Sequence, residues 1–521
     1  MLSLRRFVRP VRGASSFLLP CLFLGILGQV SARADEPDPG YWRLADIEAQ
    51  FETWANQYPE IFHRQVLGQS GQGRDIPMVL LSDSDPGEDG EPVLVFHGAL
   101  HANEPNGTTA IMHSIATLLA GYGSDAEVTA RVDGLEIYFI PILNVDGHVH
   151  VFSGAPSWQD WRKTMRDNNG NEQPDFPDDG VDLNRNWDWN WDDYEEDAPS
   201  SQKYKGPYPF SEPEIAALRD LILRTRPAVY VDYHSPVTIS WRSYVFWPWL
   251  DNVGGGGMAP DAGVAEDVAE IWSDATLNEN GSAYSDIFAY SRLPKSQNWV
   301  YGTTGIMAYI MEIADHCWWS GAMVDTVGQR VARGSMALVD RVLEGPGLSG
   351  RVTDAATGDA VVAEVVINEM HQEAIGPRLT EAEGGTFHRL TGPGTYTVTV
   401  SARGYLPETR SVPVVSTGWT AEDFALQPDV SGVAPEPTVE SLLARHALGS
   451  GDAVQLRIPA NWPTARAELF DVRGRRQARL GENLGAGTHE LSLPGSLPGG
   501  VYLLRVQAGR FEQTERLVVV P

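Results

Sequence analysis

Four residues of this 521-residue chain have types and an order that suit metal-assisted hydrolysis: His101, Glu104, His234 and Glu312. The segment His101-Ala102-Asn103-Glu104 supplies a close pair of potential ligands, and His234 comes much later in the chain. Catalytic zinc typically keeps three protein ligands and leaves a fourth position for water, and two imidazoles with one carboxylate form one of its standard sets. A lone His-x-x-Glu pair is more often structural or merely solvated, so the third ligand is essential to the interpretation.

Hydrolysis of an amide at such a centre also needs a base. Zinc lowers the pKa of a bound water toward ~7, but a second group must take the proton and later deliver it to the leaving amine. Glu312 lies between Met311 and Ile313. An ionised carboxylate among apolar residues must be paired or functional, because burying it alone is costly. Glu312 is therefore our candidate base, and a buried ion pair is the alternative.

Two arginines offer planar guanidinium groups suited to an oxyanion or a carboxylate. Arg162 stands in Trp161-Arg162-Lys163-Thr164, and Arg185 stands in Asp182-Leu183-Asn184-Arg185-Asn186-Trp187. Taken alone, both would be interpreted as surface residues.

The elements that must position these residues belong to an α/β pattern from Tyr41 to about Glu344, in which apolar runs alternate with helical spacing. Buried strands are predicted at Pro92–His97, Glu136–Leu143, Ala228–Tyr233 and Ala308–Ile313. Helices are predicted at Thr108–Ala120, at Val327–Leu343, and from a capping box at Ser211-Glu212-Pro213-Glu214 toward Arg224.

The strand predictions bring the candidate residues together. His101, His234 and Glu312 all fall at or just beyond the carboxyl end of a predicted strand. Ligands of open α/β sheets gather at that edge. We therefore expect three segments distant in sequence to converge on one site.

These motifs together resemble the zinc metallocarboxypeptidase family, which includes the digestive carboxypeptidases, over about Tyr41 to Glu344. The family itself exemplifies the ligand set of two histidines and one glutamate, so that set is assigned here by resemblance. The resemblance implies that His101, Glu104 and His234 bind one zinc ion and that Glu312 is the general base. It further implies that Arg162 stabilises the oxyanion and that Asn184 and Arg185 hold the terminal carboxylate of the substrate.

The resemblance weakens in the loop before Trp299. Tyr290 lies nine residues before Trp299, which is the family's spacing for a mobile tyrosine that closes over substrate. The family usually has a Gly/Ser-rich loop ending in Asp-Trp, where this chain has Pro294-Lys295-Ser296-Gln297-Asn298-Trp299. By position, Gln297 would lie deep in the specificity pocket, with Arg292 and Lys295 on the same loop. Asn103 also departs from the family's arginine between the ligands. The preferred terminal side chain is therefore open.

The resemblance implies an α/β fold with a mixed central sheet flanked by helices, and a metallocarboxypeptidase that hydrolyses the C-terminal peptide bond with a zinc-activated water and a glutamate base. Two alternatives remain. The same fold could cleave cell-wall peptides or remove an acyl group, or the chain could be a binding or adhesion protein on a degenerate peptidase scaffold. Loss of a ligand or of the base would favour degeneracy, and the sequence retains all of them.

Two smaller β domains are predicted to follow. Residues 347–427 alternate apolar and polar residues between Gly and Pro turns and resemble the transthyretin-like sandwich of regulatory metallocarboxypeptidases, notably at Ser401-Ala402-Arg403-Gly404-Tyr405. A generic immunoglobulin-like module is the alternative. After a proline-rich linker at 428–437, residues 438–521 repeat the β pattern. This last unit resembles C-terminal sorting domains of bacterial type IX secretion, which would make secretion machinery a partner; an ordinary sandwich is the alternative.

Residues 1–34 predict an export signal. Four arginines precede an apolar stretch, and Ser31-Ala32-Arg33-Ala34 supplies small residues for cleavage. The apolar stretch is shorter than the ~20 residues that a spanning helix needs, which argues against a membrane anchor. We therefore expect a secreted or cell-surface protein.

The formal net charge is −30, which argues against nucleic acid or anionic membranes as partners. Much of the acidic charge lies between Asp167 and Asp197, where a solvated loop is the simpler interpretation and a structural calcium site the alternative. We expect structural roles for His97, His148 and His150. Cys317 lacks an activating constellation and is expected to be a structural thiol.

Overall fold

The computed structural model of the chain describes residues 37–87, 90–154, 158–236, 243–251, 257–290, 293–372, 375–376, 378–429, 447–449, 453–458, 464–471, 476–495, 497, 500–508 and 511–520. The predicted export signal lies outside the described residues, as does most of the predicted linker at 428–437.

A nine-stranded mixed sheet forms the centre of the first part of the chain, in the order β1-β2-β4-β3-β5-β9-β6-β7, with β8 paired to β6. Its strands are β1 (Phe62–Gln69), β2 (Asp75–Leu81), β3 (Val93–His97), β4 (Glu136–Ile140), β5 (Val229–His234), β6 (Tyr244–Asp251), β7 (Gly257–Met258), β8 (Ser285–Tyr290) and β9 (Met307–Glu312).

The four strands predicted from apolar runs are the parallel centre of this sheet, β4-β3-β5-β9. Every residue of β3, β4 and β5 is buried, as expected for parallel strands covered on both faces. Strand β4 ends at Ile140, three residues before the predicted end. The predicted α/β fold with a mixed sheet is thus confirmed.

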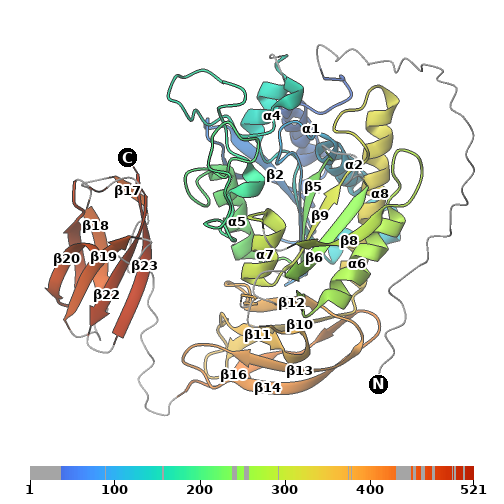
Figure 1. Cartoon of the computed structure of the whole chain (residues 1–521). Helices are drawn as coiled ribbons and strands as arrows, with labels where there is room; N and C mark the ends of the chain where they lie inside the picture. Colours follow the sequence, from blue (N-terminus) through green and yellow to red (C-terminus); the bar gives the residue numbers. More distant parts are fainter. Residues whose placement is uncertain are drawn as a thin grey trace, which may run out of the picture. The chain divides into compact units, whose positions relative to one another are not determined.

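Helices cover both faces of the sheet (Figure 1), with α6 and α8 on one side of the strands and α5 and α7 on the other. Their bounds are α1 (Leu44–Gln57), α2 (Asn106–Gly121), α3 (Ala126–Asp133), α4 (Val145–Val151), α5 (Pro213–Thr225), α6 (Ala262–Ala275), α7 (Ser296–Thr304) and α8 (Ala322–Glu344). Short 3-10 turns occur at η1 (Trp158–Asp160), η2 (Leu183–Arg185) and η4 (Asn368–Met370).

The predicted capping box before α5 is wrong, although the helix itself is present. Glu212 is the N-cap and its side chain makes no capping hydrogen bond. The Ser211 hydroxyl instead donates to Glu212 at 2.8 Å. Pro213 occupies the first helical position, where its missing N–H costs no hydrogen bond. The Glu214 carboxylate is also diverted, because it accepts the N–H of Gly71 at 3.0 Å.

A first β-sandwich packs directly against the α/β part. It contains β10 (Gly347–Asp354), β11 (Glu364–Ile367), β12 (Thr386–Leu390), β13 (Gly394–Ser401), β14 (Glu408–Val414), β15 (Trp419–Ala421) and β16 (Phe424–Leu426). Ile375 and Leu390 of this segment belong to the core of the α/β part. The Trp419 indole N–H donates to the carbonyl of Val342 in α8 at 2.9 Å. The sandwich thus has an apolar core of its own, and Ile375, Leu390 and Trp419 attach it to the core of the α/β part.

A second set of strands forms one five-stranded and one two-stranded sheet. They are β17 (Ala447–Gly449), β18 (Ala453–Ile458), β19 (Ala465–Asp471), β20 (Arg476–Leu484), β21 (Gly487–Ser492), β22 (Gly500–Ala508) and β23 (Phe511–Val520). Their apolar core, which includes Leu456, Leu469 and Leu504, is built from residues of this segment alone. The predicted β-rich C-terminal region is thus confirmed.

Among the described residues, no helix combines the length and the apolar character required to cross a bilayer.

Candidate active site

The sheet topology brings the candidate residues to one edge. His234 and Glu312 are the last residues of the parallel strands β5 and β9, and they are direct register partners. His101 and Glu104 lie in the turn between β3 and α2, just beyond the end of β3. Since neighbouring parallel strands end at the same edge of a sheet, all four side chains converge there, as predicted.

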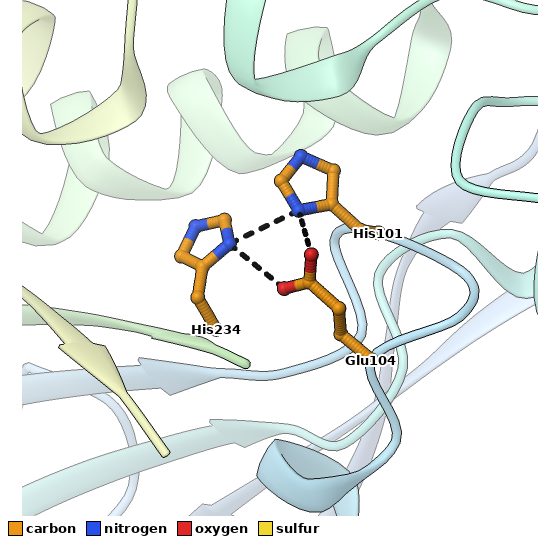
Figure 2. A group of neighbouring side chains, drawn as sticks. All are labelled: His101, Glu104 and His234. Atoms are coloured by element: carbon orange, nitrogen blue, oxygen red, sulfur yellow. Dashed lines mark hydrogen bonds and ion pairs between the residues drawn. The ribbon is translucent and has the colours of Figure 1, made fainter. Parts of the chain in front are cut away.

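The two histidines and Glu104 form a closed triangle of ligand atoms (Figure 2). His101 Nδ1 lies 3.0 Å from Glu104 Oε1 and 3.0 Å from His234 Nδ1, and His234 Nδ1 lies 3.1 Å from Glu104 Oε2. The three residues are 2%, 2% and 3% exposed. Within the described part of the chain, this is the only group of three or more His, Cys, Asp or Glu side chains that could hold a metal ion.

This triangle fits a zinc ion. Tetrahedral ligands at ~2.0–2.1 Å from zinc lie about 3.3 Å from one another, close to the separations seen here. Imidazole nitrogen and carboxylate oxygen are donor types that suit zinc.

Each histidine presents its second ring nitrogen to a carboxylate. His101 Nε2 lies 3.0 Å from Asp182 Oδ1, and His234 Nε2 lies 3.0 Å from Asp232 Oδ2. Such outer carboxylates fix the ring orientation and raise the basicity of the ligating nitrogen. Both Nδ1 atoms therefore face the triangle.

These outer carboxylates received no role from the sequence. Asp232 is also bonded by the Ser296 hydroxyl at 2.6 Å, and His97 Nε2 lies 3.5 Å from its other oxygen. One signal was available, because residues two apart on a strand face the same side, which places Asp232 beside His234.

Electrostatics of the triangle follow from this packing. Burial alone would raise the pKa of Glu104, but His101 and His234 hold it well below its usual range. Burial would lower the pKa of His234, but Asp232 and then Glu104 raise it to about 10 in the metal-free protein. A positive charge is therefore favoured at the centre of this acidic group.

Arg162 lies against the same group. Its Nη1 donates to Glu104 Oε1 at 3.0 Å, and its Nε and Nη2 donate to Asp182 Oδ2 at 3.2 Å. The structure thus places Arg162 beside a candidate ligand, with both of its ion pairs made to residues of the site.

Asn184 and Arg185 lie in η2, and Asn184 contacts the triangle. Asn184 Nδ2 lies 3.2 Å from His234 Nε2, and its Oδ1 accepts the N–H of Ser296 at 3.0 Å. Arg185 donates to the Tyr194 hydroxyl at 3.1 Å and to the carbonyl of Asn184 at 2.7 Å. Arg185 is only 7% exposed and has no carboxylate partner among the described residues. It can therefore accept an incoming carboxylate.

Glu312 presents a free oxygen to the site. Its Oε2 is buried and has no hydrogen-bond partner among the described residues. Burial raises the pKa of Glu312 to about 7, and the nearby charge of Glu104 acts in the same direction. A carboxylate with this pKa is suited to take and return a proton near neutral pH.

Tyr290 and Gln297 make no hydrogen bond to the triangle. Tyr290 ends β8, is 51% exposed and stacks edge to face on Phe288. Gln297 is 1% exposed, and its Nε2 donates to the carbonyls of Phe246 at 2.8 Å and Ala308 at 3.0 Å. The amide of Gln297 thus ties α7 to β6 and β9, and only its unpartnered Oε1 is available to a substrate.

The other singled-out residues make structural contacts. His97 bonds the Tyr230 hydroxyl at 2.5 Å, and His148 bonds the carbonyl of Trp42 at 3.0 Å. Burial raises the pKa of the Cys317 thiol far above its ordinary value, which opposes nucleophilic chemistry.

The structure gives no support to a calcium site in the acidic stretch. Asp167 accepts backbone N–H groups of its own loop, from Gly170 at 2.6 Å and from Glu172 at 2.8 Å. Asp175 accepts from the side-chain amides of Asn169 and Asn171. These oxygens hold the loop in place rather than face a common centre.

Comparison with known proteins assigns both of the first two parts of the chain. The model of the zinc carboxypeptidase family matches residues 47–319. The model of the carboxypeptidase regulatory-like domain matches residues 347–427, the bounds predicted for the first sandwich.

Individual relatives are distant. Carboxypeptidase D of Mus musculus is 26% identical over 407 residues, which are 73% of this chain and 26% of that protein. The chain thus spans about a quarter of the length of that relative. Carboxypeptidase B of Astacus astacus is 28% identical over 298 residues, covering 53% of this chain and 86% of that protein. The crystal structure of carboxypeptidase A from Helicoverpa armigera aligns with a TM-score of 0.48 and 22% identity, covering 58% of this chain and 74% of that one.

Proposed function

The chain belongs to the zinc carboxypeptidase family, and from this premise we propose that it is a secreted zinc metallocarboxypeptidase that removes C-terminal residues from peptides or proteins. The observation that carries the proposal is the buried triangle of His101, Glu104 and His234, with the unpartnered Glu312 oxygen beside it. These four residues support a proposal of metal-assisted hydrolysis.

His101, Glu104 and His234 would hold the zinc ion, which when bound polarises a carbonyl and lowers the pKa of a water molecule. Asp182 and Asp232 keep both Nδ1 atoms directed at the triangle. The chemistry of the site would thus depend on residues from the loop after β3, from the N-cap of η2 and from the end of β5.

The chain's own residues divide the remaining work. Arg185 and Asn184 bind the terminal carboxylate of the peptide, which restricts the cut to the last bond. Arg162 donates to the oxygen of the scissile carbonyl as negative charge develops on it. Glu312 Oε2 takes the proton from the attacking water and delivers it to the nitrogen of the departing residue.

Secretion is part of the proposal and rests on the sequence of residues 1–34. The type IX sorting role of residues 438–521 is likewise proposed from its sequence resemblance. Cleavage of cell-wall peptides that carry a free carboxylate is the second candidate within the same chemistry, and the Asn184–Arg185 pair is compatible with it.

Mass-spectrometric profiling of a peptide library tests the proposal. We expect removal of single C-terminal residues, no cleavage of peptides with amidated C-termini, and loss of trimming when a zinc chelator is added. Internal cuts would refute the exopeptidase assignment, and trimming that survives the chelator would refute the metal.

The Glu312→Gln variant is the matched control for the base. It should keep one zinc ion per chain and lose about 10²–10⁴-fold or more in kcat, the range of a general base. Near-normal turnover would contradict the role of Glu312. A wild-type protein that binds zinc and peptides but never cleaves them would favour the degenerate binding protein.

A further inference from the structure

Lys295 lies at the site without a role in the proposed reaction. It is the N-cap residue of α7, and its carbonyl accepts the N–H of Trp299 at 3.0 Å. The next peptide N–H, that of Ser296, donates to Asn184 Oδ1 at 3.0 Å. The backbone of Lys295 therefore adjoins the residue proposed to bind the terminal carboxylate.

The charge of Lys295 acts on the same group of residues. Burial and then the positive charge of Arg185 together lower the pKa of Lys295 to about 8, while Glu312 opposes this. The partly buried ammonium has no hydrogen-bond or ion-pair partner within the part of the chain that the structure describes. Lys295 is thus a cation without a counter-ion among the described residues, on the helix turn whose backbone bonds Asn184, and a buried charge of this kind is costly without an anion.

A comparison of the three cations of the site separates Lys295 from Arg162. Arg162 is neutralised by Glu104 and Asp182. Arg185 and Lys295 have no carboxylate partner among the described residues, and the N-terminus of α7 adds the positive end of a helix dipole. The acids whose charges act on Lys295 are Glu312, which also has an elevated pKa, and Asp232, which is committed to His234 and Ser296.

Arg185 and Lys295, the two cations of the site without a carboxylate partner among the described residues, could each bind one negative group of a ligand. The terminal carboxylate of a peptide supplies one, at Asn184 and Arg185. Gln297 cannot serve as the donor for a second, because its amide N–H groups are used by two backbone carbonyls. Lys295 is then the donor on the first turn of α7 with no partner among the described residues, and its long stem allows its ammonium to follow a side-chain carboxylate.

We propose that Lys295 binds the side-chain carboxylate of the substrate's last residue, so that the site prefers peptides ending in glutamate or aspartate. This inference rests on the proposed function and names its substrate class. Lys295 acts here as a specificity-determining residue and takes no part in bond cleavage.

Three peptides that differ only in a terminal Glu, Gln or Lys test the proposal. With wild-type protein, kcat/KM for the Glu peptide should exceed that for the Gln peptide by about ten- to a hundredfold, the range of one charge-assisted hydrogen bond. In Lys295→Met this ratio should fall to within about threefold, and Lys295→Glu should favour the Lys peptide. Lys203→Met, which removes an exposed lysine, should keep the wild-type ratio.

Another use of Lys295 would give a different pattern. If its ammonium assisted Arg185 on the terminal carboxylate, or only stabilised α7, Lys295→Met would lower kcat/KM equally for all three peptides. An unchanged Glu/Gln ratio in Lys295→Met would therefore overturn the proposal, as would a wild-type preference for the Gln or Lys peptide.

A binding measurement separates this inference from the proposed function. Calorimetric titration of zinc-loaded Glu312→Gln with free L-glutamate and L-glutamine measures recognition without turnover. Tighter binding of glutamate that disappears when Lys295→Met is added supports the role of Lys295 even if no peptide is cleaved. Equal affinity for both amino acids overturns it even if carboxypeptidase activity is found.

Discussion

At the scale of single residues, the site is organised by carboxylates that do not face the metal position. Each candidate ligand histidine is held between the triangle and an outer aspartate, Asp182 for His101 and Asp232 for His234. Asp232 is itself fixed by the Ser296 hydroxyl. A buried network of this kind specifies one ring orientation only when its members are satisfied.

We predict that Asp232→Asn weakens zinc binding by about 10–100-fold, the usual effect of removing an outer-sphere carboxylate. The neutral amide keeps the shape of the side chain but no longer draws the Nε2 proton of His234. Competition with a chromophoric chelator at fixed pH measures the dissociation constant. Asp85→Asn, an exposed change, is the control. An unaltered zinc affinity in Asp232→Asn would mean that the backbone alone sets His234.

The buried carboxyl group of Glu214, which lies outside the candidate active site, should make the free energy of unfolding depend on pH. Burial raises its pKa from 4.5 to about 7, against the effect of the Gly71 N–H. Between these values the folded chain binds a proton that the unfolded chain has released. The free energy of unfolding therefore falls as pH rises from 4.5 to 7, and the loss persists above pH 7.

The amide of Glu214→Gln cannot ionise, so its free energy of unfolding should not show this loss. The difference in unfolding free energy between the variant and the wild type should therefore rise by about 2 kcal/mol from pH 5 to pH 8. Denaturant unfolding of the metal-free protein at both pH values gives this difference, in which any pH-independent cost of the amide cancels. Glu60→Gln, at an exposed position, should show no such gain. A difference between variants that is equal at both pH values would refute the buried ionisation.

At the scale of elements, α7 connects the sheet to Asn184, which accepts the Ser296 N–H. The Gln297 amide bonds carbonyls of β6 and β9, and the helix ends at Gly305, whose φ of +66° suits glycine. A Cβ added at Gly305 would also collide with the Arg378 side chain. The first turn of α7, with Lys295 and Ser296, is therefore held in a fixed place.

Replacing Gln297 with Met should leave two buried carbonyls without their donor and cost about 1–3 kcal/mol of stability. Zinc affinity should stay within about twofold, because Gln297 makes no contact with the triangle. Thermal unfolding and chelator competition on the same samples check both parts. A stable variant with altered terminal-residue preference would instead assign Gln297 to the specificity pocket.

The elements that carry the ligands could be predicted because long apolar runs and motifs within a few residues specify them. The parallel strands ending near His101, His234 and Glu312 are of this kind. The contacts of Asp232 with His97 and Ser296 join residues 64 or more positions apart, and no local pattern records them. The capping box at Ser211 failed because the Ser211 hydroxyl bonds the adjacent Glu212 and the distant Asn186 amide, while Glu214 bonds the distant Gly71 N–H.

At the scale of the whole molecule, the first sandwich is bonded to the α/β part by buried side chains and is not an independent domain on a linker. Asp261 has a fully buried side chain and is paired with Arg378 of the sandwich and with the Tyr301 hydroxyl of α7. Arg341 of α8 donates to the carbonyls of Pro346 and Thr391. Helix α7 is thus held by the sheet through Gln297 and by Asp261, the partner of Arg378, through Tyr301.

A chain that ends at Glu344 should therefore unfold at a much lower temperature than the full chain, because it loses the Arg378 partner of Asp261 and exposes apolar core. In contrast, a chain that ends at Asp429 should melt within about 3 °C of the full protein and bind the same amount of zinc, since residues 447–520 form a core of their own. Scanning calorimetry and metal analysis of both truncations measure these effects.

The full-length variant Arg378→Met tests the same contact without truncation. It leaves the Asp261 carboxylate buried and unpaired, which should cost about 3–5 kcal/mol. Adding Asp261→Asn removes the buried charge and should restore a large part of that loss, whereas a surface ion pair would show almost no such coupling. If Arg378→Met unfolds like wild type, and the chain ending at Glu344 does too, the sandwich adds no stability to the catalytic part and α7 is held by the sheet alone.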